Sequence, residues 1–242
     1  MNQYKKLISW VFILVLWQCI ALMIHNDILV PTIQETVLAC FNLLKTSSFY
    51  SGICITAYRI LKGFFISFSL ALFLTSIVIL KRSFLDWLEP IRILTKSIPN
   101  ITYIIIAILW CGAEGAVSVI LSMILFPIIL NALLDEVEKN KALLDIQKMY
   151  KDTPMFTLKL YYESVLLLPM IQITKTSLAM GFKVGVMAEI LSSVRNGMGR
   201  GMQYAKLNLD TATIFAYTIC IFILIKFIDI CLDTLQKHFE SM

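Results

Sequence analysis

The amino-acid sequence predicts an all-α membrane protein with six transmembrane helices. Hydrophobic residues make up 59% of the chain and charged residues 15%, which is too apolar for an ordinary soluble domain. Several apolar runs approach the roughly 20 residues that a helix needs to cross a bilayer, and they are continuous rather than alternating, so a β-barrel is excluded. We expect one transmembrane domain, 1–242, with an N-terminal unit, 1–52, and a five-helix core, 53–242.

The N-terminal unit contains the first predicted span, Leu7–Ile24, which follows two lysines. No small-residue cleavage site comes after it, so we interpret it as a retained span, and an uncleaved signal anchor stays open as an alternative. Thr32 then precedes Glu35 by three residues. This capping-box pattern predicts an amphipathic helix that ends near Ser47, on the outer side of the membrane.

The second span is predicted over 53–80, which is longer than one bilayer requires. Arg59 and Lys62 lie toward its outer end, where long cationic side chains reach water at little cost. The stretch 83–100 is predicted to be cytoplasmic, with a short helix bracketed by Pro90 and Pro99.

The third span, 101–111, is short, and a tight turn at 112–115 returns the chain into the fourth span, 116–134. The fifth and sixth spans are predicted over 165–191 and 211–230. A glycine-rich outer loop connects these last two.

The distribution of Lys and Arg predicts which loops are cytoplasmic. Cytoplasmic loops of membrane proteins carry an excess of these residues. Twelve lie in segments assigned to the inside and four in outer loops, which fits six spans with both termini inside. The four outer ones are Lys45, Arg195, Arg200 and Lys206.

The sequence contains no pattern typical of an enzyme site. A Walker-type phosphate loop, HExxH and GxSxG are all absent, and the chain has two histidines. The six cysteines are scattered singly without a CxxC pair, so we expect free thiols that behave as small hydrophobes and no metal site. We expect no catalytic residue and no cofactor. Transport, a membrane scaffold or an anchor subunit remain.

The stretch 145–170 is the one long polar interruption in the C-terminal half of the chain. Its apolar residues recur at helical spacing, and Thr153 before Pro154 is typical of a helix that restarts. We therefore expect a short amphipathic helix, a break and a second helix that runs into the membrane. Such a cytoplasmic element is suited to contact with another protein.

Four short segments carry a resemblance to a known family. They are RILKGF at 59–64, SIP at 97–99 with LWCG at 109–112, FPIILN at 126–131, and AEIL at 188–191 with GMG at 197–199. In this order and at these separations, the chain resembles over nearly its whole length the permease subunits of bacterial ABC importers. It is similar to the branch that moves nitrate, taurine, aliphatic sulfonates and some vitamin precursors.

The resemblance implies a type I importer bundle in the bacterial inner or plasma membrane. It implies a passive pathway for a small polar solute, driven by a separate ATPase dimer that binds the ATP. The other implied partners are a second permease copy and an extracytoplasmic substrate-binding protein. A non-transporting scaffold or assembly subunit is the alternative function.

The resemblance also implies that the segment 145–163 is the coupling element, because the family's EAA loop stands there and fits a groove on the ATPase. This copy differs from the family motif: Gln147 stands near the second alanine, and Lys151 or Asp152 fills the glycine position. A helix in a groove needs large apolar anchors on one face. The candidate anchors are Met149, Tyr150 and Met155, and the alternative is that they pack on the chain's own spans.

Gly181 and Gly185 form a GxxxG pattern in the fifth span. Small residues let helices approach closely, so the pair predicts helix packing, within this bundle or against a second copy. Glu189 ends the same span beside the glycine-rich loop. We expect it either to pair with Arg195 or Arg200 and shape the outer gate, or to stand in water at the interface.

Lys175 and Lys183 also lie in the fifth span, eight residues apart. This spacing places them within roughly 80° on one side of a helix and about 12 Å apart along its axis. Charges inside membranes usually face the bundle interior or a watery cavity, so together with Glu189 they are candidates for the translocation pathway of an anion. The alternative is that each lysine snorkels to a different face of the membrane.

Overall fold

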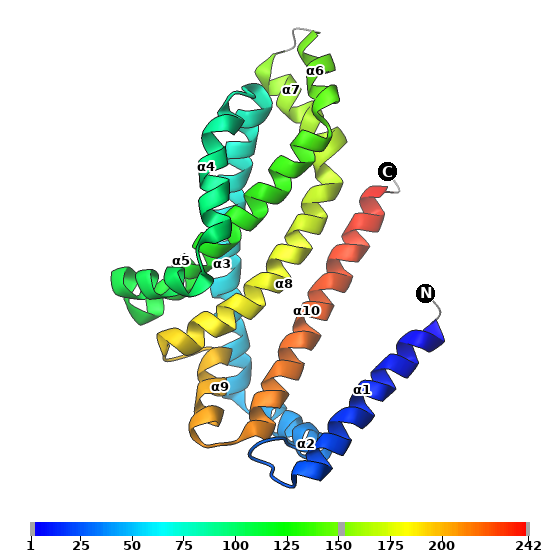
Figure 1. Ribbon diagram of the computed structural model, residues 1–242, viewed down its shortest axis with the longest axis vertical. Helices are drawn as coiled ribbons and strands as arrows, with labels where there is room; N and C mark the ends of the chain where they lie inside the picture. Colours follow the sequence, from blue (N-terminus) through cyan, green and yellow to red (C-terminus); the bar gives the residue numbers. More distant parts are fainter. Residues whose placement is uncertain (1–2, 150–152, 241–242) are drawn as a thin grey trace.

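The structure is a computed structural model that describes residues 3–149 and 153–240 (Figure 1). The described residues are almost entirely helical and contain no strand, so the all-α prediction is confirmed. The helices are α1 Gln3–Ile24, α2 Ile33–Leu44, α3 Ser47–Leu80, α4 Phe84–Ser97, α5 Asn100–Lys139, α6 Lys141–Met149, α7 Pro154–Tyr161, α8 Leu167–Ser192, α9 Met198–Leu207 and α10 Thr211–Glu240, with a π-helical turn at Tyr162–Leu166 between α7 and α8.

Five helical segments of the described chain are long and apolar enough to cross a membrane, where six spans are predicted. They are Leu7–Ile24, Ser47–Leu80, Asn100–Lys139, Pro154–Ser192 and Thr211–Lys237. The count differs because the predicted third and fourth spans both fall within α5. The first arm of α5, before Gly112, has 12 residues and a length of about 18 Å, which is too short to cross a bilayer core of about 30 Å alone.

Gly112 divides α5 into two helical arms. Its φ of 66° and ψ of 174° are outside the helical region, and a positive φ is accessible to glycine at little cost. Open space surrounds the position of a missing Cβ, so the backbone conformation, not crowding, requires glycine here. The kink falls at the start of the turn predicted over 112–115.

The centre of the bundle is made by α3, α5 and α8, which contact one another. In the most apolar stretch of each helix, 56% of the residues of α5 are buried, against 6% in α1 and 11% in α10. The long exposed faces of α1 and α10 are apolar, as expected for helices surrounded by lipid.

The helix α4 differs from its prediction in two ways. Pro90 lies inside the helix and does not bracket it. The helix is also docked through a buried cation: the Arg92 guanidinium donates to the Asn131 side chain at 2.9 Å and to Asp135 at 2.8 Å, both on α5. These contacts fix α4 against the second arm of α5.

The predicted capping box at α2 is confirmed. The Glu35 backbone N–H donates to the Thr32 hydroxyl at 3.3 Å, and the Thr32 N–H donates to the Glu35 carboxylate at 2.8 Å. This second bond lowers the pKa of Glu35. The Trp17 indole N–H donates to the Pro31 carbonyl at 3.0 Å, which ties α1 to the start of α2.

The helices α6 and α7 lie together at one end of the molecule, and α2 and α9 lie near the other end (Figure 1). The helices α3, α8 and α10 run between these two ends. Pro154 is the first residue of α7 and Thr153 precedes it in an extended conformation, as the restart pattern predicts.

Candidate functional site

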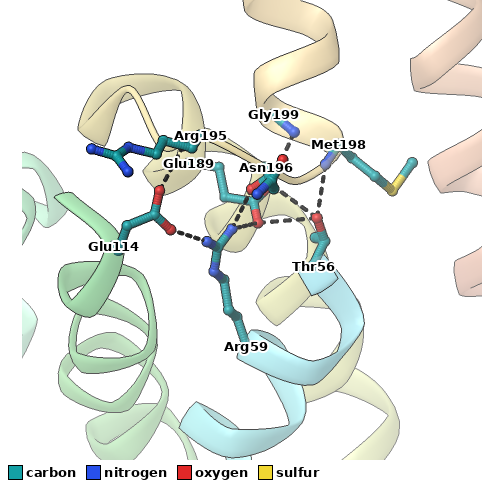
Figure 2. Close-up of polar contacts among 8 residues, drawn as sticks. All are labelled: Thr56, Arg59, Glu114, Glu189, Arg195, Asn196, Met198 and Gly199. Carbon is teal, nitrogen blue, oxygen red and sulfur yellow. Dashed lines mark hydrogen bonds and ion pairs between the residues drawn. The ribbon is translucent and has the colours of Figure 1, made fainter. Parts of the chain in front are cut away.

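The residues of the sequence motifs meet in a buried polar cluster at the end of α8 (Figure 2). Its centre is Glu189, whose side chain is fully buried. The carboxylate accepts hydrogen bonds from Arg59 at 2.7 Å, from the Thr56 hydroxyl at 2.9 Å and from the Gly199 backbone N–H at 2.9 Å. A charge removed from water is costly unless it is paired and hydrogen-bonded, and these three donors meet that requirement.

Arg59 connects the cluster to two further segments. Its guanidinium donates to the Asn196 carbonyl at 2.7 Å, in the loop before α9, and forms an ion pair with Glu114 on α5. Glu114 also accepts the Arg195 backbone N–H at 2.6 Å. One arginine on α3 therefore joins α5, α8 and the 193–197 loop.

The loop glycines are required by close approach to Glu189. Gly197 has a φ of 134°, and a Cβ at this position would lie 2.5 Å from the Glu189 carboxylate oxygens. A Cβ at Gly199 would lie 2.5 Å from the Glu189 Cβ. The next backbone N–H after Gly197, that of Met198, donates to the Thr56 hydroxyl at 2.9 Å. Only residues without side chains leave room for this arrangement.

Glu189 thus has a different partner from those expected. It pairs with Arg59, whereas the Arg195 backbone binds Glu114 and the Arg200 guanidinium stacks on the Tyr204 ring at 4.1 Å. It is also not an interfacial carboxylate in water, because solvent does not reach it. The reason is that α3 passes directly beside the end of α8 and brings Arg59 to the carboxylate from within the bundle.

Thr56 and Glu114 belong to the cluster and were not predicted. A signal for the ion pair exists in the sequence, since an arginine and a glutamate inside apolar segments usually seek opposite charges. Glu114 sits in the glycine-flanked turn beside Gly112. No spacing rule connects residues 59, 114 and 189, because their contact depends on how the helices pack.

The two lysines of the predicted pathway are separated in their surroundings. Lys175 is largely buried, forms an ion pair with Asp233 on α10 and donates to the Gln236 side chain at 3.4 Å. Lys183 is exposed and has no ion-pair partner among the residues whose side chains the structure describes. The two lysines therefore differ in their surroundings and do not line one common pathway as a pair of free positive charges.

The helix-packing glycines face α3. A Cβ at Gly181 would lie 3.1 Å from the Ile60 side chain, and a Cβ at Gly185 would lie 2.9 Å from it. Ile60 is fully buried and follows Arg59 directly in the sequence. The close approach of α3 and α8 at these glycines therefore also positions Arg59 near Glu189.

The coupling candidates lie in or next to α6 and α7. Tyr150 and Asp152 are outside the described residues, as are the side chains of Gln147 and Met149. Met155, on α7, is 79% exposed. Exposed apolar side chains that were not predicted lie near it in the sequence: Leu143, Ile146 and Phe156. Charged residues flank these apolar side chains in the sequence, so contact with lipid does not explain their exposure.

The cluster is built from paired charges and hydrogen bonds that connect separate helices. The described residues hold no group of three His, Cys, Asp or Glu side chains that suits a metal ion. A cavity of about 240 Å³ opens beside the cluster, with Arg195, Asn196, Gly197 and Arg200 among its lining residues. The cluster can hold three helices and a loop in one arrangement. The Glu114 side chain is half-exposed, so its carboxylate can contact solvent in place of Arg59.

No protein-family model matches the chain, and no curated protein matches it.

Proposed function

We propose that the chain is the membrane-spanning permease subunit of a bacterial ABC importer. It forms the pathway for a small polar solute, with sulfonate-like and nitrate-like anions as the first class to test. A separate ATPase dimer binds the ATP, and an extracytoplasmic protein delivers the solute to a pair of permease copies. Both termini face the cytoplasm of a cell bounded by this inner or plasma membrane.

The observation that carries the proposal is the ion pair between Arg59 and Glu189. These residues come from two of the motif segments, RILKGF at 59–64 and AEIL at 188–191, which lie 130 residues apart in the chain. The glycines of a further motif segment, GMG at 197–199, close around the same carboxylate. Residues from three separate motif segments thus lie in one arrangement, which supports treating them as parts of a single functional unit.

The proposal requires six crossings from five long helices. We assign the third crossing to α4 together with the first arm of α5. They contain 14 and 12 helical residues, and neither alone reaches the roughly 20 that a crossing needs. The four acidic and amide partners of Arg92 keep its charge from facing lipid: Glu89, Asn131, Asp135 and Glu138.

Coupling to the ATPase is assigned to α6 and α7. A helix that docks in a groove presents exposed apolar anchors, and Met155 and Phe156 at the start of α7 have this character. The helical segment Pro154–Ser192 continues from there, through the π-helical turn at Tyr162–Leu166, to Glu189. A push on α7 by the closing ATPases therefore reaches the ion cluster at the opposite end, and rocking of packed helices is a common route between access states.

The proposal is tested by assembly. The chain is co-expressed with any Walker-motif ATPase found to be encoded beside its gene. The purified complex is assayed for stoichiometric amounts of that ATPase and for ATP hydrolysis that an extracytoplasmic binding protein encoded there stimulates. A complex with stimulated hydrolysis supports the proposal. A well-behaved permease that binds no such ATPase in detergent or in nanodiscs contradicts it.

A further inference from the structure

Two cysteines that are distant in the sequence lie against each other where α2 packs on α10. Cys40 is in α2 and Cys220 is in α10, 180 residues later. The Cys40 thiol is 4.0 Å from the Ala216 carbonyl, which is one helical turn before Cys220. The Cys220 side chain is also close enough to lower the pKa of the Cys40 thiol, against the larger effect of burial, which raises it. Figure 1 shows α2 beside the first turns of α10.

The other four cysteines lack this arrangement. Within the described residues, Cys19, Cys54, Cys111 and Cys231 are exposed, and none has a thiol partner. Cys40 and Cys220 are both half-buried. This proximity therefore distinguishes one pair among the six thiols, although the sequence contains no CxxC or other spacing that would identify it.

The surroundings of the pair leave room for reaction. A cavity of about 330 Å³ lies between α2 and the start of α10; its lining includes Ala39, the residue before Cys40, but neither cysteine. A small reagent can approach α2 from this side. Burial raises the pKa of the Cys40 thiol and the nearby Cys220 side chain lowers it by a smaller amount, so the thiolate is a minor species and reaction is slow without excess oxidant.

We propose that Cys40 and Cys220 form an intramolecular disulfide when the chain meets a small-molecule or protein disulfide as oxidant. The thiolate of one cysteine attacks the oxidant's S–S bond, forms a mixed disulfide and releases one thiol. The second cysteine, as its thiolate, then attacks the protein sulfur of that mixed disulfide and releases the other thiol. The protein loses two protons and two electrons, and the oxidant is reduced to two thiols.

The disulfide fastens the N-terminal unit, 1–52, to the last helix. The predicted topology puts α2 on the outer side of the membrane, where disulfides persist in bacteria. The bond closes a loop that contains the whole α3–α9 core, and closing a long loop restricts the unfolded chain. Oxidation should therefore raise the midpoint of thermal unfolding by several degrees.

The test uses the full-length protein, both wild type and a variant that keeps Cys40 and Cys220 while the other four cysteines are changed to alanine. After incubation with excess oxidised glutathione, free thiols are capped with a maleimide-polymer, counted by gel shift, and cross-linked peptides are identified by mass spectrometry. The expected result in both proteins is a Cys40–Cys220 peptide and a higher unfolding midpoint that dithiothreitol reverses, and the two-cysteine variant should lose both free thiols without keeping bound glutathione.

The matched control keeps Cys54 and Cys220 and changes the other four cysteines, Cys40 included, to alanine. It should form no Cys54–Cys220 peptide under the same conditions. The proposal is overturned if the Cys40/Cys220 variant keeps both thiols while the same chain oxidises once unfolded in detergent, if the control forms its own disulfide to the same extent, or if cross-linked dimers form in place of the intramolecular bond. These readouts require no transport, so they are independent of the proposed importer function.

Discussion

Glu189 carries a carboxylate where solvent does not reach, so its neighbours determine whether that charge is tolerated. The Arg59 guanidinium supplies the compensating charge, and Glu114 binds the same guanidinium from a half-exposed position. The two acidic residues therefore differ in importance. Removing the partner of a fully buried charge is severe, whereas a partly exposed pair contributes little.

This difference predicts the effects of two substitutions on stability. Arg59→Met leaves Glu189 unpaired and should lower the free energy of unfolding by about 3–5 kcal/mol. Glu114→Gln keeps a hydrogen-bonding side chain in a half-exposed site and should cost about 0–1 kcal/mol. Thermal unfolding of both purified variants in one detergent makes the comparison. Equal losses would mean that Glu189 is not the main partner of Arg59.

At the scale of the element, α3 is the helix on which the others are arranged. It brings Gly63 against α5, Ile60 against the glycines of α8, and Arg59 to Glu189. A Cβ at Gly63 would lie 2.5 Å from the Leu121 Cβ and 3.0 Å from the Ser118 carbonyl oxygen. Neither atom can move without shifting the backbone of α5.

Gly63→Ala should therefore force α3 and α5 apart. Overpacking of this kind costs about 1–3 kcal/mol, and the helix propensity gained by alanine does not exceed about 1 kcal/mol. Gly115→Ala is the control, because its nearest neighbour would be the Cys111 Cβ at 3.4 Å, an ordinary contact. The readout is folded yield and unfolding midpoint. A Gly63→Ala protein as stable as the control would show that the two helices adjust freely.

The helices themselves could be predicted from the sequence, because long apolar runs have few alternatives to helical structure in a membrane. The capping box at Thr32 was local and was also predictable. The docking of α4 was not, since the charge of Arg92 does not indicate that residues 131 and 135 will surround it. The cluster was found only in part for the same reason: Arg59 and Glu189 are 130 residues apart, and their contact depends on tertiary packing.

At the scale of the whole molecule, α8 connects the end that holds α6 and α7, which we propose as the docking end for the ATPase, to the cluster around Glu189. The docking end carries exposed Met155, and Met155→Glu should reduce the amount of co-purified ATPase at least severalfold while the permease stays monodisperse. A charge in an apolar groove is costly to bury, which is the physical reason. Lys159→Gln is the control on the same helix, and it should leave assembly unchanged. Full assembly by the Met155 variant would move the docking site elsewhere.

The two lysines of α8 should differ in their effect on solute uptake, because their charges are compensated differently. Lys175 is neutralised by Asp233, while Lys183 retains an uncompensated charge among the described side chains. Lys183→Met should therefore lower the uptake of an anionic solute severalfold, and Lys175→Met should have a smaller effect. Uptake is compared in proteoliposomes with equal amounts of assembled complex. Normal import by both variants would remove the charge-based argument for an anion.

The central claim is that this chain forms an ATP-driven import pathway, and solute uptake tests it most directly. Proteoliposomes contain the permease and the ATPase, with ATP inside and the binding protein and radiolabelled sulfonate, taurine or nitrate outside. The account predicts accumulation of at least one of these solutes, dependent on ATP and abolished when the Walker lysine of the ATPase is replaced. A stable complex that hydrolyses ATP but accumulates none of them, nor any solute carried by its own binding protein, would contradict the claim and identify the chain as a scaffold subunit.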